Sequence, residues 1–272
     1  MDLLIDTDMG GDIDDALALS MALKDDSIHV RGITTVYTAN AWRTDLVRRM
    51  VRVYRRDAPV YAGAEKPLMG TWGQEECGRN DAADFLCAQA EKGPVTLLAI
   101  GPLTNVAAAL LKNPGIAQNL RMFIMGGMIG CAYPEWNIQC DPEAAQIVMT
   151  SGADITLVGL DVTEKCRLTE KEAWDLVRGE DASMKFLHGE MQRFFDQFHF
   201  LPTLHDPLAL LCLLKEDICQ YEMKDIQVET QGKWTRGVTV DCRFSEKKRI
   251  RTAVSVRAEE AVREICCRVR GE

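Results

Sequence analysis

The sequence lacks an excess of basic residues. Its 272 residues include 32 lysines and arginines against 41 aspartates and glutamates, so the formal net charge is -9. A chain with this charge repels a polyanion unless a local basic patch overrides the repulsion, and we find no block that would form one. We therefore expect no nucleic-acid partner.

Long apolar runs are also missing. No uninterrupted apolar stretch is long enough to span a bilayer, and the N-terminus has neither the basic nor the apolar segment of a signal peptide. These absences predict that the protein has no membrane partner and lies in the cytoplasm.

The cysteines follow no recognisable framework. The 10 cysteines include no Cys-x-x-Cys pair and no metal-type spacing, which in a chain of this length without an export signal predicts reduced, mostly buried thiols. Internal repeats, low-complexity tracts and linkers are absent as well. We therefore expect residues 1–272 to form a single domain.

Short apolar runs alternate with longer amphipathic segments. The predicted strands are 2–6, 30–36, 95–100, 120–127 and 153–161. The predicted helices are 14–24, 42–56, 81–92, 103–113 and 141–152. Because parallel neighbours require a crossover connection, this alternation predicts an open, mostly parallel, Rossmann-like α/β sheet flanked by helices.

The rest of the chain departs from this alternation. Residues 169–215 are mainly helical in pattern, and residues 226–244 resemble an antiparallel hairpin. We expect this C-terminal helical region and β-hairpin to decorate the sheet. Residues 64–80 have the composition of one long loop, and long loops in compact domains are often functional.

Aspartates crowd the end of the first predicted strand. One or two could cap the helix that follows, but capping does not explain five. Like charges a few Å apart repel and favour protonation unless a cation binds. Since the donors are all oxygens with no histidine or cysteine nearby, the cluster predicts a Ca²⁺ or Mg²⁺ site. Its members are Asp6, Asp8, Asp12, Asp14 and Asp15.

Several segments together resemble one known family. In chain order they are DTDMGGDIDDALAL (6–19), LLAIGPLTNVAAAL (97–110), FIMGGM (123–128), EWNIQCDPEAA (135–145), LHDPLAL (204–210) and TRGVTVD (235–241). They are similar to those of the nucleoside hydrolases, the inosine-uridine preferring ribohydrolases, over nearly the whole chain. The resemblance implies Ca²⁺-dependent hydrolysis of the N-glycosidic bond of ribonucleosides to free base and ribose. It also implies a homodimer or homotetramer.

The resemblance further implies a metal-binding set. The carboxylates of Asp8, Asp15 and Asp206 and the backbone carbonyl of Ile100 would hold the Ca²⁺. Asp8 would also serve as the general base that takes the proton of the metal-bound water as it attacks the anomeric carbon.

Ribose contacts are implied in the same way. Asp14 would bind the 2′-hydroxyl, Asn137 the 3′-hydroxyl and Glu135 would lie near the 5′-hydroxyl, although Pro-Glu-Trp-Asn alone is an ordinary polar turn. Asn40 would lie near the attacking water. The acidic stretch has two more residues than the usual family pattern, so Asp12 could share or exchange the role of Asp14.

His205 has two interpretations. The resemblance implies that it donates a proton to the leaving base, a task that its near-neutral reference pKa suits. The local residues equally predict a helix start capped by Asp206, with Pro207 in the first turn. Nearby, Phe194, Phe195 and Phe198 have the helical spacing of core residues rather than of a base platform.

Two alternatives from other classes stay open. A strand ending in Asp-x-Asp also occurs in Mg²⁺-dependent phosphohydrolases, which additionally need a lysine and a serine or threonine to hold the phosphate. Phosphate release would identify such an enzyme. A relative that has lost hydrolysis would bind a nucleoside or a related ribosyl compound without turning it over.

Overall fold

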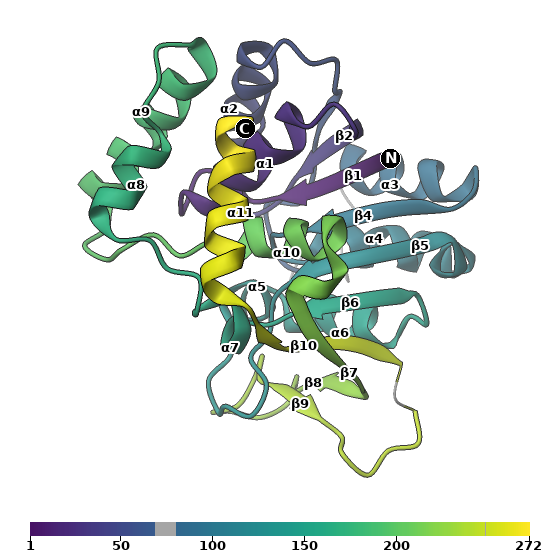
Figure 1. The fold of residues 1–272 in the computed structure, drawn as a ribbon. Coiled ribbons are helices and arrows are strands. Elements are labelled where there is room, and N and C mark those ends of the chain that lie inside the picture. The colour runs from purple at the N-terminus through teal and green to yellow at the C-terminus, as the bar shows by residue number, and fades with distance from the viewer. Residues whose placement is uncertain (69–79, 248) are drawn as a thin grey trace.

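The central feature of the computed structural model, which describes residues 1–68, 80–247 and 249–272, is one large sheet (Figure 1). Within these residues the sheet has eight strands in the order β3-β2-β1-β4-β5-β6-β10-β7. The strands are β1 (Asp2–Thr7), β2 (His29–Thr35), β3 (Val60–Ala62), β4 (Val95–Ala99), β5 (Leu120–Met125), β6 (Asp154–Val158), β7 (Cys219–Lys224) and β10 (Ile250–Val256). A separate two-stranded sheet pairs β8 (Ile226–Val228) with β9 (Thr239–Asp241).

The helices lie between the strands along the chain. They are α1 (Asp14–Lys24), α2 (Asn40–Val53), α3 (Asp81–Glu91), α4 (Thr104–Lys112), α5 (Trp136–Cys140), α6 (Pro142–Thr150), α7 (Leu160–Thr163), α8 (Glu170–Leu176), α9 (Ala182–Gln197), α10 (His205–Leu214) and α11 (Ala258–Arg270). Short 3-10 helices run over η1 (Pro114–Asn119) and η2 (Glu216–Ile218). None of these described helices is long and apolar enough to cross a membrane.

The strand order creates a crevice at one edge of the sheet. All pairings of the large sheet are parallel except the pairing of β7 with β10. From β1 the chain first builds β2 and β3 on one side and then returns to build β4 on the other. At such a reversal the loops that leave the carboxyl ends of β1 and β4 continue in opposite directions from neighbouring strands, and ligands of open parallel sheets bind there.

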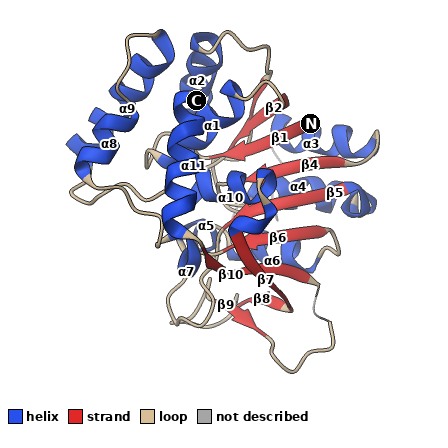
Figure 2. Ribbon diagram, in the orientation of Figure 1, coloured by secondary structure: helices blue, strands red, loops and turns tan. Residues whose placement is uncertain are grey.

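Helices cover both faces of the sheet (Figure 2). Leu17 of α1, Leu208 of α10 and Ile265 of α11 are buried in the apolar layer on one face. Val106 of α4 and Val148 of α6 belong to the layer on the other face. Burial on both faces explains why the central strands are almost continuously apolar in sequence.

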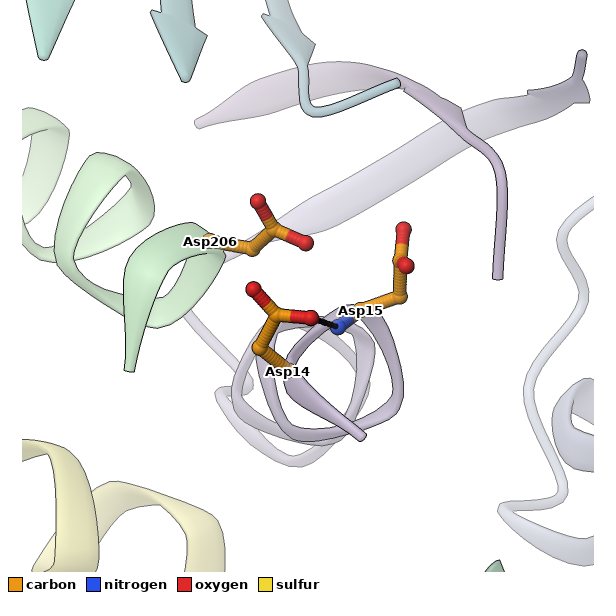
Figure 3. Close-up of side chains that lie close together, drawn as sticks. All are labelled: Asp14, Asp15 and Asp206. Carbon is orange, nitrogen blue, oxygen red and sulfur yellow. Dashed lines mark hydrogen bonds between the residues drawn. The ribbon is translucent and has the colours of Figure 1, made fainter. Parts of the chain in front are cut away.

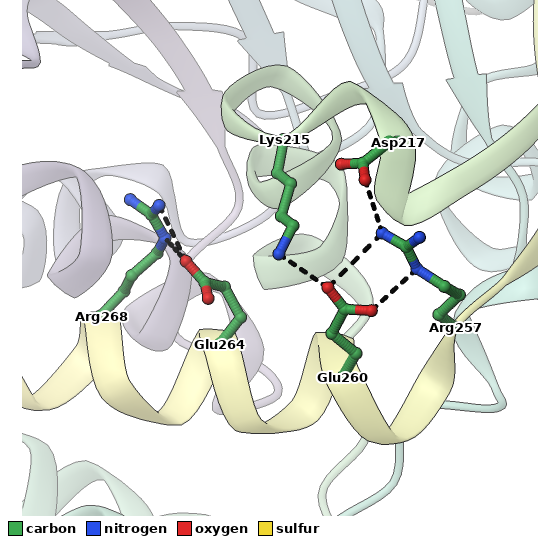
Figure 4. A network of polar contacts seen from close by, with 6 residues as sticks. All are labelled: Lys215, Asp217, Arg257, Glu260, Glu264 and Arg268. Atoms are coloured by element: carbon green, nitrogen blue, oxygen red, sulfur yellow. Dashed lines mark hydrogen bonds and ion pairs between the residues drawn. The ribbon is translucent and has the colours of Figure 1, made fainter.

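A network of ion pairs joins the C-terminal helix to the end of α10 (Figure 4). Lys215 contacts Glu260 at 2.7 Å, and Arg257 contacts Glu260 at 2.8 Å and Asp217 at 2.8 Å. These side chains are partly exposed, so solvent screens each pair and its contribution to stability is small. The network nevertheless fixes α11 against α10, the helix whose first residues enter the crevice.

The predicted fold class is confirmed, and most predicted elements are present. The helix expected over 14–24 has those bounds, and the hairpin expected over 226–244 forms as β8 and β9. The strand expected over 153–161 is too long, because β6 ends at Val158 and α7 begins at Leu160. Of the loop expected over 64–80, residues 69–79 lie outside the described residues.

The last quarter of the chain differs from its prediction. Besides decorating the sheet, it adds β7 and β10 to it, and it ends in α11. The Cys219–Lys224 segment was missed because it is largely polar and half exposed, as an edge strand is. The short strand Val60–Ala62, at the opposite edge, was missed because its three partly exposed residues are too few to form a recognisable strand pattern.

Two phenylalanine substitutions test the described core. Phe123 is fully buried in β5 and Phe244 is fully exposed. We expect Phe123→Ala to lower the free energy of unfolding by about 3–5 kcal/mol, because it removes a packed ring and leaves a cavity. The matched control Phe244→Ala should change it by less than about 0.5 kcal/mol. Urea unfolding measures both, and equal effects would contradict this placement of the core.

Candidate active site

A cavity of about 400 Å³ opens in the crevice at the carboxyl ends of β1 and β4. Acidic side chains line one part of it and apolar side chains line the other. The acidic residues are Asp8, Asp12, Asp14, Asp15, Glu135 and Asp206. Four of the five aspartates of the predicted cluster thus line one cavity at this edge of the sheet. Asp6 does not line it, because its fully buried carboxylate accepts from Thr34 and Asn105 instead.

Three carboxylates converge at the centre of the acidic part (Figure 3). Asp14 and Asp15 begin α1, and Asp206 is the second residue of α10. One carboxylate oxygen from each of the three lies within 4.8 Å of the others, and all three side chains are buried. Two helix N-termini thus meet at one point, and their partial positive charge favours carboxylates there.

Glycines allow the loops around these carboxylates to come close. Gly10 has a φ of +119°, a conformation that L side chains rarely adopt, and a Cβ there would lie 2.4 Å from the Trp42 ring. A Cβ on Gly101, after β4, would lie 2.9 Å from the backbone nitrogen of Asp8. The loop after β1 therefore needs glycine at position 10 for its backbone conformation and its approach to α2, and the loop after β4 needs glycine at position 101 for its approach to Asp8.

Asp8 and Ile100 lie on these two loops, and both line the cavity. The backbone N–H of Ile100 donates to the carbonyl of Asp6 at 2.8 Å, which joins the two loops beside the cavity. The Ile100 carbonyl accepts a hydrogen bond from the Asn137 amide at 3.0 Å and keeps a second lone pair. Asp8, Asp15, Asp206 and Ile100 are thus brought to one cavity, together with Asp14.

Burial and mutual repulsion disfavour the ionised form of these carboxylates. Burial first, and then neighbouring carboxylates, raise the pKa of Asp14, Asp15 and Asp206 well above its ordinary value. Burial also raises the pKa of Asp8 to about 6, although the Arg43 guanidinium opposes the shift. A bound cation would offset this repulsion, and an all-oxygen donor set fits Ca²⁺ or Mg²⁺.

Arg43 is a site residue that the sequence did not reveal. It is the only buried lysine or arginine among the described residues, and its guanidinium donates to the carbonyls of Asp8, Met9 and Thr38. It therefore fixes the loop that carries Asp8 and brings one positive charge to the carboxylates. In sequence it looks like one more arginine of an amphipathic helix, so no local signal separates it from its exposed neighbours.

Glu135 and Asn137 line the cavity as the family resemblance implies. The Glu135 carboxylate also caps α5, because it accepts from the backbone N–H groups of Gly127, Asn137 and Ile138 at 2.8 to 3.2 Å. The Asn137 amide nitrogen donates to the carbonyls of Ile100 and Met125. Both side chains are thus held rigidly, and the Asn137 amide oxygen stays available to a ligand.

Asn40 lies outside this cavity. Its amide nitrogen donates to the carbonyls of Thr35 and Gly63, and only 1% of the residue is exposed. These bonds tie the end of β2 to the segment after β3. We therefore assign Asn40 a structural part rather than the substrate contact expected from the sequence. Asp12, by contrast, lines the cavity rim beside Asp14.

His205 also lines the cavity. Its Nδ1 lies 2.7 Å from the hydroxyl oxygen of Thr163. Burial, with a smaller contribution from Arg167, lowers the pKa of His205 to about 4. Asp206 does not cap this helix as the local residues predict, because Leu204 occupies the N-cap position without a side-chain hydrogen bond, and Asp206 and Pro207 lie in the first turn. The imidazole of His205 lines the cavity, and its role toward the leaving base stays a prediction.

Aromatic and aliphatic side chains form the apolar part. They are Tyr37, Met125, Trp136, Leu160, Phe198 and Phe200. Phe194 is fully buried in the core, as its spacing predicts. Phe198 differs from that prediction, because α9 ends at Gln197 and Phe198 lines the cavity. Phe200, for which no sequence pattern made a prediction, lines the cavity as well. A flat ring such as a nucleobase fits against such a surface.

Comparison with known proteins agrees with this geometry. Residues 3–263 match the family model of the inosine-uridine preferring nucleoside hydrolases. The chain is 33% identical to uridine nucleosidase 1 of Arabidopsis thaliana, with 85% of this chain and 79% of that protein covered. It is 32% identical to the pyrimidine-specific ribonucleoside hydrolase RihA of Escherichia coli O81 strain ED1a, with 88% and 87% covered. The solved purine-preferring ribonucleoside hydrolase of Gardnerella vaginalis superposes with a TM-score of 0.81 at 29% identity, covering 100% of this chain and 98% of that one.

Calcium should stabilise the protein through the three converging carboxylates. We expect Ca²⁺ at a hundred times its dissociation constant to add about 2.7 kcal/mol to the free energy of unfolding of metal-stripped protein. Asp15→Asn and Asp206→Asn should lose most of this gain, whereas exposed Asp57→Asn should keep it. The gain should be larger at pH 8 than at pH 5, because protons compete with the metal at carboxylates of raised pKa.

Thermal unfolding with and without Ca²⁺ measures the gain for each variant. An equal gain in Asp206→Asn and Asp57→Asn would place the binding site elsewhere.

Proposed function

The chain belongs to the inosine-uridine preferring nucleoside hydrolase family and is a hydrolase of N-glycosyl compounds, and we propose that it cleaves ribonucleosides in a Ca²⁺-dependent reaction with Asp8 as general base. The products are the free base and ribose. The observation that carries the proposal is the convergence of Asp14, Asp15 and Asp206 beside Asp8 in the one cavity.

The residues present fit a calcium ion. The carboxylates of Asp8, Asp15 and Asp206 and the carbonyl of Ile100 would hold it, and the raised pKa values of the carboxylates are what an acidic set without its cation should have. When bound, Ca²⁺ supplies a positive charge that orients a water and the ribose hydroxyls and lowers the pKa of that water.

Asp8 removes a proton from the attacking water while the water oxygen bonds to the anomeric carbon. The arginine beside it supports this task in two ways. Arg43 holds the backbone of Asp8 and Met9, so that the carboxylate keeps its direction. Its charge also favours the ionised form of Asp8, which is the form that can accept a proton.

We propose that polar side chains around the general base, Asp8, bind the ribose. We assign the 2′-hydroxyl to Asp14, the 3′-hydroxyl to the free amide oxygen of Asn137, and the 5′-hydroxyl to Glu135. Since Glu135 and Asn137 are rigidly held, they orient the sugar before reaction, and hydroxyl contacts that strengthen toward the oxocarbenium-like transition state raise the rate.

The departing base lies on the other side of the anomeric carbon. There His205 borders the apolar part of the cavity, where Trp136, Phe198 and Phe200 offer ring surfaces. The relatives named above include pyrimidine-specific and purine-preferring enzymes. The substrate class that we propose is therefore the ribonucleosides as a whole, and the homodimer or homotetramer implied by the resemblance stays a prediction.

The cavity disfavours the phosphohydrolase alternative. Among the described residues, no lysine lines the cavity. The Nε and Nη1 atoms of Arg43 donate to backbone carbonyls rather than into the cavity. Six carboxyl groups in the lining would repel a phosphate. The non-catalytic alternative loses support because the proposed base and the full set of proposed metal donors are present.

Free-sugar release tests the proposed reaction. We expect purified protein with Ca²⁺ to release ribose from at least one member of a panel of purine and pyrimidine ribonucleosides, and to stop when a chelator removes the metal. Restored activity on adding Ca²⁺ back is the control for damage by the chelator. A folded, calcium-loaded protein that releases no ribose from any member would contradict the proposal.

Replacement of the proposed base tests the role of Asp8. We expect Asp8→Asn to lower kcat by about 10³-fold or more, because general-base catalysis alone contributes about 10²–10⁴-fold and the substitution also removes a metal donor. Asp57→Asn, on an exposed surface, should keep full activity. Ribose release from the best substrate measures both, and a fully active Asp8→Asn protein would rule out this mechanism.

A further inference from the structure

The hydroxyl of Thr163 contacts one nitrogen of the His205 imidazole, Nδ1. Thr163 ends the short helix α7, is fully buried, and lies 2.7 Å from Nδ1 of His205. The Nε2 atom has no hydrogen-bond partner among the described residues, and the imidazole lines the cavity. One ring nitrogen is therefore paired inside the protein and the other is left for a ligand.

Backbone pairing holds the two segments in place. The N–H of Leu204 donates to the carbonyl of Cys166 at 2.8 Å, and the N–H of Leu168 donates to the carbonyl of Pro202 at 3.0 Å. An antiparallel bridge joins Arg167 to Thr203 between these bonds. Thr163 and His205 therefore cannot separate unless this short ladder opens.

The hydroxyl has one proton and two acceptors in reach. It lies 3.4 Å from the carbonyl of Leu160 and 2.7 Å from Nδ1 of His205. If Nδ1 carried the imidazole proton, the hydroxyl could donate only across the long contact to Leu160, and a buried donor would be poorly satisfied. The short contact is best used when the hydroxyl donates to a bare Nδ1.

We propose that Thr163 is a positioning residue that holds His205 in the tautomer with the proton on Nε2, directed into the cavity. The inference rests on the proposed function and deepens it. At pH 8 the imidazole is neutral, so only the choice of tautomer decides whether Nε2 offers a donor or an acceptor.

The tautomer determines what His205 does for the leaving base. As the C1′–N bond breaks, its electron pair stays on the base, and the Nε2–H group donates a hydrogen bond to the base atom that gains negative charge. The opposite tautomer would present a lone pair and repel that charge. A hydroxyl that touches no substrate thus acts on the reaction through the imidazole.

Two substitutions at one position test the role of the hydroxyl at pH 8 in calcium-loaded enzyme. Thr163→Val keeps the branched shape and removes the donor, and Thr163→Ser keeps the donor. On the best ribonucleoside we expect Thr163→Val to lower kcat about tenfold or more, since leaving-group assistance is worth about 10²–10⁴-fold in full. KM should change little, and Thr163→Ser should retain most of the activity.

The leaving group separates positioning from general damage. 4-Nitrophenyl β-D-ribofuranoside presents the same anomeric carbon but needs no help to expel its phenolate. We expect Thr163→Val to leave kcat for this compound nearly unchanged and to add nothing to the defect of His205→Ala on the ribonucleoside. An equal loss on both compounds, or additive losses with His205→Ala, would overturn the proposal.

The tautomer of His205 can be measured directly, without a catalysed reaction. In calcium-loaded protein with ¹⁵N-labelled histidine, we expect the ring shifts of His205, assigned with His205→Ala, to show a proton on Nε2 and a bare Nδ1. Thr163→Val should increase the other tautomer, and Thr163→Ser should not. A proton on Nδ1 in the wild type would overturn the proposal. If the wild type hydrolyses neither compound, the proposed function fails while this spectrum still decides the tautomer.

Discussion

The repulsion among carboxylates buried at the end of β1 is the constraint on which the rest of the site depends. Asp8, Asp14, Asp15 and Asp206 come from three segments into one cavity, and Arg43 is the only buried lysine or arginine in the part of the chain that the structure describes. The fold opposes the repulsion with two helix N-termini and this one guanidinium, which is less charge than the cluster carries. A cation that enters the cavity therefore binds to a site already built for it.

The strand order explains why such a site can exist. The reversal at β1 leaves its carboxyl end beside that of β4, so that Asp8 and Ile100 meet without a long loop. Asp206 lies more than a hundred residues after Ile100 in the sequence, at the start of α10. That helix is buried in the apolar layer beside α1 and is tied at its far end to α11. The position of Asp206 in the acidic part of the cavity thus relies on core packing.

Sequence alone predicted the parts whose cause is local. An apolar run, two glycines and paired aspartates predict a strand, a tight turn and the helix of Asp14–Lys24, and the acidic cluster follows. The long-range parts needed the family resemblance, because nothing near His205 or Glu135 distinguishes a site from a helix cap. Arg43 and Thr163 escaped both approaches. Their roles depend on backbone carbonyls and an imidazole that only the folded chain brings near, and edge strands such as Cys219–Lys224 lack the apolar pattern of central strands.

The central claim is that the converging carboxylates hold one Ca²⁺. A crystal of the protein grown with CaCl₂ and measured for anomalous scattering by calcium tests it most directly. The account predicts one strong peak in the cavity, about 2.3–2.6 Å from carboxylate oxygens of Asp15 and Asp206, with further oxygens from Asp8 and Ile100. A cavity without anomalous density in fully folded protein, or calcium bound only outside it, would contradict the account.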